Sequence, residues 1–398
     1  MGLVVVGLSG GVDSSVAAFL LKEMGHEVIG LFMRNWTDES VTLEAECTWI
    51  EDSNDALLVA DKLEIPFQVL DLSVEYKSRI VDYMFSEYKV GRTPNPDILC
   101  NREIKFDIFL KAALSIGADF VATGHYVQKT TTGNGVHHLL SGSDKSKDQS
   151  YFLCQLNQEQ LAKSIFPIGH LAKSEVRRIA DKVGLGTANK KDSQGLCFIG
   201  KVRLPVFLQQ KLKPKKGRII EVSSSWSGFD QPEWGVPWPL DFSCGKIIGN
   251  HNGAYYYTIG QRKGLLVGGM PLPLFVISID VINNIVFVGQ GDDHPGLYRP
   301  FLKILSKDVH FVSRLDQMNI GEVRNYNVRI RYRQDLFSAT LKMETEGLYL
   351  ESKKPMKSVA PGQFASWYRG EELIGCLLYT SDAADDLLCV DLGGRRII

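Results

Sequence analysis

A glycine- and serine-rich turn follows directly on the first apolar run of the chain. Residues 3–6 read Leu-Val-Val-Val, which is typical of a buried parallel strand, and apolar residues recur at helical spacing after Ser14. Between them stands a turn made of Gly7, Leu8, Ser9, Gly10, Gly11, Val12, Asp13 and Ser14. Backbone N–H groups at a helix N-terminus attract anions, and glycines let a ligand approach closely. The pattern therefore predicts a strand, a polyphosphate-binding turn (the phosphate turn, residues 7–14) and a helix.

Strand-like and helical patterns alternate through the first half of the chain. Strands are expected over 27–33, 67–72 and 119–123, and helices over 56–63 and 104–116. Such alternation predicts an α/β fold with a doubly wound parallel sheet, whose ligands gather at the carboxyl ends of the strands. Gly7, Met33 and Gly124 all fall at such ends.

The second half changes character. A helical pattern over 155–184 is followed by a lysine-rich stretch, and strands are then expected over 255–259, 274–279 and 285–288. Asn283-Asn284 is a hairpin signal between the last two strands. We expect an α/β domain over 1–200, a small mixed central domain over 201–270 and a C-terminal β-barrel over 271–378.

Composition limits the possible classes of protein. A chain of 398 residues exceeds the usual size of a single core, which agrees with several domains. Its net charge of −1 gives no large basic excess, so any RNA contact must come from local patches. No apolar stretch approaches a membrane span and no signal-peptide pattern is seen, so we expect a cytoplasmic protein without a membrane partner. Seven cysteines spread over this length do not suggest a disulfide framework.

Two cysteines stand in polar surroundings. Cys100 follows the loop 93–99, with a helix expected to start near Asn101, and Cys197 lies behind the glycine-containing segment 192–196. A helix start or a neighbouring cation lowers the pKa of a thiol and favours thiolate chemistry. Taken singly, either cysteine could equally be a small buried apolar residue.

Six motifs occur in order between Gly7 and Leu265. They are S-G-G-V-D-S, T-P-N-P-D-I-L-C-N-R-E-I-K-F, A-T-G-H-Y, K-D-Q-S-Y-F-L, G-L-C-F-I and Y-Y-T-I-G-Q-R-K-G-L. The series resembles the tRNA-specific 2-thiouridylase family of the PP-loop ATP pyrophosphatase superfamily. The resemblance implies that ATP adenylates the C2 oxygen of the wobble uridine of tRNA. Sulfur from a cysteine persulfide then replaces that oxygen, and pyrophosphate and AMP are released.

The resemblance also implies roles for single residues. ATP is expected on residues 7–14 with Met33 and Gly124, and Asp13 is expected to help hold Mg²⁺. Cys100 matches the nucleophile and Cys197 the persulfide cysteine. Whether the two form a transient disulfide or Cys100 assists the attack in another way stays open. Contacts with the target base or the tRNA are implied for Asn95, Pro96, Asp97, His125, Lys147, Asp148, Gln149, Arg331, Tyr332 and Gln363.

Two of these positions have simpler alternatives. His125 could be a satisfied core histidine at a strand end. Alternation over 328–333 places Arg329, Arg331 and Arg333 on one face of an expected strand, where they would suit phosphates or be a solvated barrel face.

The resemblance implies two partners, a tRNA of the lysine, glutamate or glutamine type and a persulfide donor or relay protein. The chain departs from the family in an insertion over 223–244 with no assigned role, and in the run 379–398, which we expect to be a non-native tail. A different PP-loop enzyme or a tRNA-binding protein without catalysis are the alternatives. A different PP-loop enzyme would not need the two cysteines, and a tRNA-binding protein without catalysis would not need an intact phosphate turn.

Overall fold

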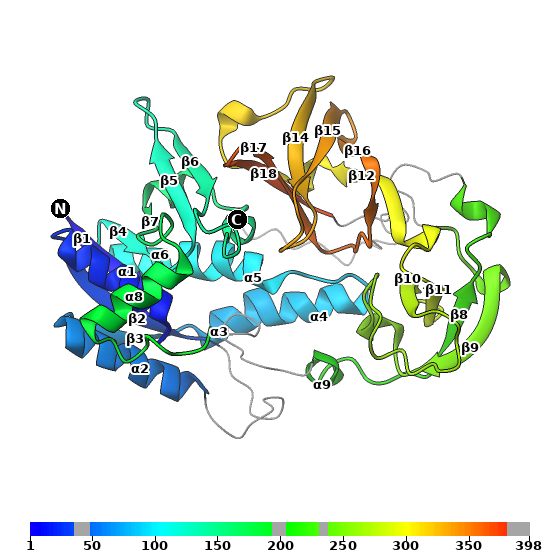
Figure 1. The fold of residues 1–398 in the computed structure, drawn as a ribbon, viewed down its shortest axis with the longest axis horizontal. Coiled ribbons are helices and arrows are strands. Elements are labelled where there is room, and N and C mark those ends of the chain that lie inside the picture. Colours follow the sequence, from blue (N-terminus) through cyan, green and yellow to red (C-terminus); the bar gives the residue numbers. More distant parts are fainter. Residues whose placement is uncertain (36–47, 193–203, 231–237, 380–398) are drawn as a thin grey trace, which may run out of the picture.

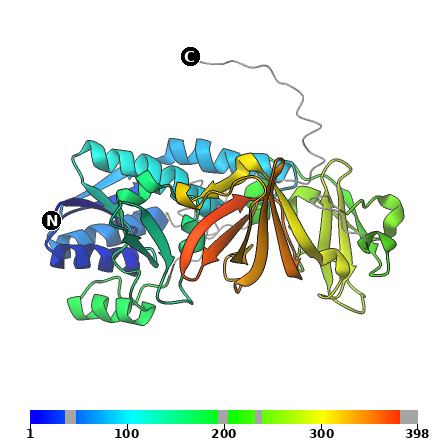
Figure 2. The same cartoon turned by 90° about the horizontal axis from the view of Figure 1, so that it is seen from above.

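The structure is a computed structural model that describes residues 1–35, 48–192, 204–230 and 238–379. It is elongated, with an N-terminal α/β part at one end, a small β part at the other and a larger antiparallel sheet between them (Figures 1 and 2). Among the described residues, no helix combines the length and apolar character needed to cross a bilayer.

A parallel sheet organises the N-terminal part. Its order is β3-β2-β1-β4-β7, and all neighbouring strands run parallel. The strands are β1 (Leu3–Gly7), β2 (Glu27–Arg34), β3 (Phe67–Asp71), β4 (Phe120–Ala122) and β7 (Ser164–Ile165). The expected parallel sheet is therefore confirmed, and Gly7, Met33 and Gly124 lie at or just beyond the carboxyl ends of its strands.

Helices cover both faces of this sheet. In β1, Val4 and Val6 enter the core shared with α1, α2 and α8, whereas Val5 enters the core on the opposite face. The first face carries α1 (Val12–Glu23), α2 (Thr48–Leu63) and α8 (Lys173–Val183). The second carries α3 (Ser73–Tyr76), α4 (Asp82–Lys89), α5 (Pro96–Leu99), α6 (Phe109–Ser115) and α7 (Gln158–Ala162). Alternate side chains of a strand point to opposite faces, which is why one apolar run feeds two cores.

One helical run carries Cys100. It begins with α5, continues as a π-helix over Cys100–Ile108 and ends with α6. The expected start near Asn101 is therefore wrong. The helix begins at Pro96 because Asn95 caps it, with its Oδ1 accepting from the Ile98 N–H at 3.3 Å, and because proline suits the first helical position.

The central part is a four-stranded sheet of order β10-β11-β8-β9, preceded by α9 (Leu204–Gln209). Its strands are β8 (Gly217–Val222), β9 (Gly245–His251), β10 (Leu274–Asp280) and β11 (Ile285–Gln290). The expected boundary at residue 270 is wrong, because β11 pairs in parallel with β8 and brings β10 with it. The Asn283-Asn284 hairpin is confirmed, with Asn284 in the left-handed region at φ 57°.

Two further expectations concern this central part. The strand expected over 255–259 is wrong, because Ala254–Tyr256 forms a 3-10 turn. The described part of the 223–244 insertion packs into the central core, where Trp238 is 5% exposed and its indole N–H donates to the Gly296 carbonyl at 3.0 Å.

The C-terminal part is a curved antiparallel sheet of barrel-like form, part of a nine-stranded sheet. It contains β12 (Tyr298–Leu305), β13 (Val309–Phe311), β14 (Val323–Arg329), β15 (Phe337–Glu344), β16 (Gly347–Lys357), β17 (Phe364–Arg369) and β18 (Glu372–Leu378). The hairpin of β5 (Val127–Thr131) and β6 (His137–Ser141) leaves the N-terminal part and pairs with β18. The N-terminal and C-terminal parts therefore contribute strands to one sheet.

Two sequence expectations fail within this sheet. The strand expected over 328–333 ends at Arg329, and the chain then turns, with Arg333 in the left-handed region at φ 65°. The three arginines therefore do not share a strand face. Tyr379, just beyond β18, packs on this sheet, because it is 9% exposed in the core cluster of the C-terminal part and its N–H donates to the Gln363 carbonyl at 2.9 Å. The remaining residues of the expected tail, 380–398, lie outside the described residues.

Candidate active site

The phosphate turn joins β1 to α1, and hydrogen bonds of a serine hydroxyl to the backbone of the turn stabilise it. The Ser9 N–H donates to Ser14 Oγ at 3.1 Å, and Ser14 Oγ donates to the Gly11 carbonyl at 3.1 Å. Ser9 is exposed, whereas Ser14 is buried at the start of the helix. The first N–H groups of α1 have no acceptor within their own helix, so the turn offers donors to an anion.

Two close approaches require glycine here. Gly10 has φ 71°, and a Cβ on it would lie 2.2 Å from the Asp52 carbonyl oxygen. A Cβ on Gly124 would lie 2.7 Å from the backbone of Asp13 and Ser14. The structure thus places Gly124 against the turn, and it places the Met33 methyl 3.3 Å from the position of a Cβ on Gly7. The residues predicted to surround ATP therefore meet at one edge of the sheet.

Asp13 lies in the first turn of α1 and is engaged by two side chains. Lys173 Nζ lies 2.8 Å from each carboxylate oxygen, and the Tyr126 hydroxyl donates to Oδ1 at 2.6 Å. Burial and the nearby Asp13 raise the pKa of Tyr126, so its hydroxyl stays protonated and donates. A cation already occupies both oxygens of Asp13. Moreover, the described residues hold no group of three or more His, Cys, Asp or Glu side chains suited to a metal ion. The donor set at Asp13 therefore does not fit a resident Mg²⁺.

A second carboxylate, Asp192, extends this network. It lies 2.8 Å from Lys173, 2.7 Å from Lys147 and 2.9 Å from Arg177. Burial alone would raise the pKa of Asp192, but hydrogen bonds from Lys147 and Lys173 outweigh it and lower that pKa to about 2. Lys147, predicted to face tRNA, is thus joined to the phosphate turn through Asp192 and Lys173.

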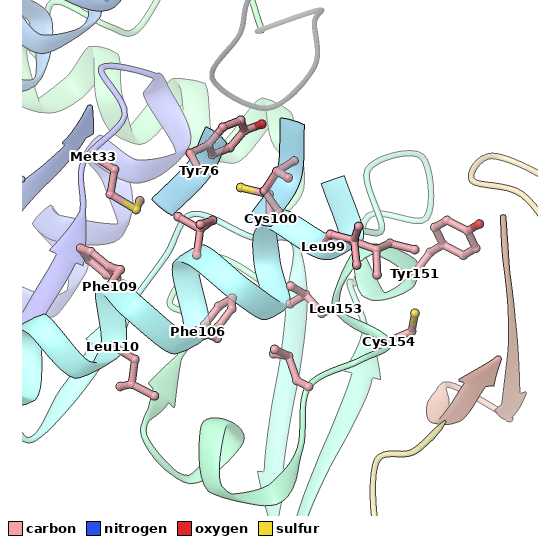
Figure 3. Close-up of a cluster of buried hydrophobic side chains, with 14 of the residues drawn as sticks. Met33, Tyr76, Leu99, Cys100, Phe106, Phe109, Leu110, Tyr151, Leu153 and Cys154 are labelled. Atoms are coloured by element: carbon pink, nitrogen blue, oxygen red, sulfur yellow. The ribbon is translucent and has the colours of Figure 1, made fainter. Parts of the chain in front are cut away.

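Cys100 lies at the start of the π-helix, within the apolar cluster of Figure 3. Its exposed fraction is 0%, and Leu99, Tyr76 and Met33 belong to the same cluster. The same helical run reaches the phosphate turn, because Phe109 lies 3.6 Å from the position of a Cβ on Gly7. Cys197, the predicted persulfide cysteine, lies outside the described residues.

The loop before α5 is held by the other two parts of the molecule. The Gln363 side-chain amide donates to the Thr93 carbonyl at 2.7 Å and to the Pro94 carbonyl at 3.3 Å. The Thr93 N–H donates to the Pro361 carbonyl at 2.7 Å, and the Thr93 hydroxyl lies 3.0 Å from that of Thr258 in the central part. Asn95 caps α5, Pro96 is buried and Asp97 is half-buried, so the three predicted base contacts sit on a braced loop.

Other predicted tRNA contacts serve the fold in this structure. His125 is buried and lies 2.7 Å from the Thr123 hydroxyl, and burial together with Lys105 lowers its pKa well below the ordinary value. Asp148 is buried and accepts from the Gly142 and Ser150 N–H groups at 3.1 Å. Gln149 Oε1 accepts from the Tyr126 N–H at 3.0 Å. The histidine therefore has the environment of a satisfied core residue.

Arg329, the last residue of β14, and Arg331 also make contacts within the protein, whereas Arg333 is exposed. Arg329 is 12% exposed and pairs with Asp148 at 3.2 Å. Arg331 donates to the Ile259 carbonyl at 3.2 Å and to the Ser358 carbonyl, which links the central and C-terminal parts. The Tyr332 ring lies 4.2 Å from that of Phe152. Arg329 and Arg331 therefore join the parts of the molecule rather than line an outer strand face.

Lys173, Asp192, Tyr126 and Thr258 are among the site residues that sequence reasoning missed. Lys173 is 160 positions from Asp13, and no local pattern connects them. Tyr126 and Thr258 do lie inside two of the motifs quoted above, A-T-G-H-Y and Y-Y-T-I-G-Q-R-K-G-L. Membership of a long motif was therefore the available signal for these two.

Family models match the three parts of the chain. Residues 2–201 match the tRNA methyl transferase HUP domain, residues 206–290 the tRNA methyl transferase PRC-barrel domain, and residues 302–376 the aminomethyltransferase beta-barrel domain. The second match ends where β11 ends, in agreement with the strand pairing. A solved 4-thiouridine synthetase–RNA complex with bound ATP shares 19% identity at a TM-score of 0.34, covering 52% of this chain and 50% of that one. That likeness is too distant to support a conclusion.

Curated relatives match nearly the whole chain. The protein named tRNA-specific 2-thiouridylase MnmA of Christiangramia forsetii is 58% identical over 94% of this chain and 99% of its own length. The protein of the same name from Flavobacterium johnsoniae is 55% identical over the same shares. That of Karelsulcia muelleri is 48% identical over 94% of this chain and 97% of its own. This chain therefore belongs to the tRNA-specific 2-thiouridylase family.

Proposed function

We propose that this enzyme uses ATP to replace the C2 oxygen of the wobble uridine of tRNA with sulfur. Near-full-length identity to relatives named 2-thiouridylases supports the activity. The observation that carries it is the helical run Pro96–Ser115, which bears Cys100 at one end and packs on the phosphate turn through Phe109. One continuous helical run therefore connects Cys100 with the nucleotide site.

The chemistry proceeds in two steps. The uracil C2 oxygen attacks the α-phosphorus of ATP, the bond from that phosphorus to the bridging oxygen breaks, and pyrophosphate leaves with the electron pair. The terminal sulfur of a Cys197 persulfide then bonds to C2, and AMP leaves with the former C2 oxygen. Adenylation is needed because an unmodified oxygen is a poor leaving group. Mg²⁺ enters, in this proposal, with the phosphates of ATP and not on a protein site.

The sulfur–sulfur bond to Cys197 must also break. In one route the Cys100 thiolate attacks Cys197 Sγ, so that a Cys100–Cys197 disulfide forms and the electron pair of the broken bond passes to the sulfur on C2. In the other, the Cys100 thiolate first attacks Cys197 Sγ, so that the disulfide forms and hydrosulfide leaves with the electron pair of the broken bond, and this hydrosulfide then attacks C2. Both routes require that the Cys100 sulfur, buried in this structure, be uncovered when tRNA is bound. The resemblance extends the proposal to lysine, glutamate and glutamine tRNAs and to a persulfide donor or relay protein.

Complementation of a strain that lacks its thiouridylase tests this function. Mass spectrometry of the wobble nucleoside should show 2-thiouridine when this gene is supplied, and no 2-thiouridine when the gene carries Cys100→Ser. Restoration of a different modified nucleoside would contradict the proposal.

A further inference from the structure

The phosphate turn contains no lysine of its own, yet the fold brings one to it. Lys173 is the first residue of α8, and its ammonium lies 2.8 Å from both oxygens of Asp13 and from Asp192 Oδ1. Its side chain is 12% exposed. A cation is thus held at the edge of a turn that is built to receive an anion.

Several contacts fix this ammonium in place. The Lys173 N–H donates to Asp144 Oδ2 at 3.0 Å, which anchors the backbone at the start of α8. Lys173 Nζ lies 5.7 Å from the Tyr126 ring centre, and the hydroxyl of that ring binds Asp13. Immobilising a lysine costs side-chain entropy, so the number of contacts made to this one indicates a defined position.

Lys173 can also contact a new anion without leaving either carboxylate unpartnered. Asp192 keeps Lys147 and Arg177 as partners, at 2.7 and 2.9 Å. Asp13 keeps the Tyr126 hydroxyl at 2.6 Å. A polyphosphate at the turn would therefore compete for Lys173 without leaving Asp13 or Asp192 unpartnered.

We propose that Lys173 contacts the polyphosphate of ATP on the phosphate turn and neutralises the charge of the departing pyrophosphate. The inference rests on the proposed function. As the bond from the α-phosphorus to the bridging oxygen breaks, the electron pair moves onto pyrophosphate, and an ammonium fixed beside it stabilises that charge. A lysine from the first turn of α8 thereby supplies the cation that the turn itself lacks.

ATP affinity measured without tRNA tests this contact. Equilibrium dialysis with radiolabelled ATP in excess EDTA keeps Mg²⁺ out of the comparison. Lys173→Met should weaken ATP binding about tenfold or more, because a charge-assisted hydrogen bond is lost. Lys173→Arg should retain most of the affinity, and the exposed Lys182→Met on the last turn of α8 is the matched control. Unchanged affinity in Lys173→Met overturns the inference.

A second comparison separates phosphate contact from mere neutralisation of Asp13. In an Asp13→Asn background the carboxylate charge is gone, so Lys173→Met leaves no unpaired partner there and folding is preserved. The double variant should still bind ATP about tenfold more weakly than Asp13→Asn alone. Equal affinities would show that Lys173 only neutralises Asp13, which overturns the inference. Failure of the wild-type protein to bind ATP both in EDTA and with Mg²⁺ supplied would instead contradict the proposed function.

Discussion

Cys100 carries the proposed sulfur chemistry, and the fold keeps its side chain covered. It is 0% exposed among Leu99, Tyr76 and Met33. Exclusion of water from a reactive sulfur protects it from side reactions until substrate is present. Asp13 presents the opposite case, because it is partly exposed and already bound by Lys173 and Tyr126. In the proposed mechanism, the side chains around Asp13 are therefore already in position, whereas the Cys100 sulfur has to be uncovered before it can react.

Asp13→Ala should abolish ATP-dependent thiolation while tRNA affinity changes less than about twofold. The carboxylate orients Lys173 and the start of α1 and has no described contact with the loop 93–97. Pyrophosphate release and filter binding of tRNA measure the two effects separately. Wild-type pyrophosphate release in the variant would remove Asp13 from the reaction.

Asp192 should make a contribution to stability that depends on pH. Its pKa is lowered to about 2 in the folded protein from an ordinary value of 3.8, so it stabilises the fold fully above about pH 4 and loses this effect as pH falls toward 2. The difference in unfolding free energy between wild type and Asp192→Asn should therefore shrink from about pH 5 to about pH 2. Asp181→Asn, which removes an exposed carboxylate from α8, is measured in parallel as the control. A constant difference for Asp192→Asn would contradict the assignment.

At the scale of elements, the proposed function depends most on the helical run Pro96–Ser115. The sequence predicted its middle from apolar spacing, but not its start, which depends on the Asn95 cap and on Pro96 in the first helical position. The strand predicted over 328–333 was wrong for a related reason. Alternation over 328–333 is compatible with a strand, yet the chain turns after Arg329 because Arg331 bonds to carbonyls of two other segments. Tertiary partners of this kind leave no local pattern.

Gln363 should act by bracing the loop 93–97. Gln363→Ala should raise amide hydrogen exchange in that loop and lower kcat for thiolation about tenfold or more, because a small displacement of the target base is costly. Gln363→Glu should behave in the same way, since a carboxylate cannot donate to the Thr93 and Pro94 carbonyls. Gln317→Ala, on an exposed residue of the same part, is the control. Normal kcat with weakened tRNA binding would instead make Gln363 a direct tRNA contact.

At the scale of the whole molecule, strand pairing and hydrogen bonds around the site join the three parts. The β5–β6 hairpin of the N-terminal part extends the C-terminal sheet through β18. The parallel sheet could be predicted from alternation, because each βα unit is local in sequence. The boundary between the central and C-terminal parts, after Gln290, could not be predicted in this way. It depends on the pairing of β11 with β8, which lies more than sixty residues earlier in the chain.

The end of the chain gives a matched pair of truncations. Removal of 380–398 should leave thermal stability unchanged, as the departure from the family pattern predicts. Removal of 379–398 should cost about 2 kcal/mol or more, because Tyr379 is 9% exposed and bonds to Gln363. The melting temperatures of both truncations measure this. Equal losses in the two would show that residues beyond Tyr379 also pack on the sheet.

Reconstituted thiolation tests the account most directly. The purified protein is incubated with unmodified tRNA, a persulfide donor and ATP, and wobble 2-thiouridine and pyrophosphate are measured together. We predict one pyrophosphate for each sulfur incorporated, with no 2-thiouridine when ATP is omitted or when Cys100 is changed to serine. Sulfur incorporation without ATP, or at the wild-type rate in Cys100→Ser, would contradict the account.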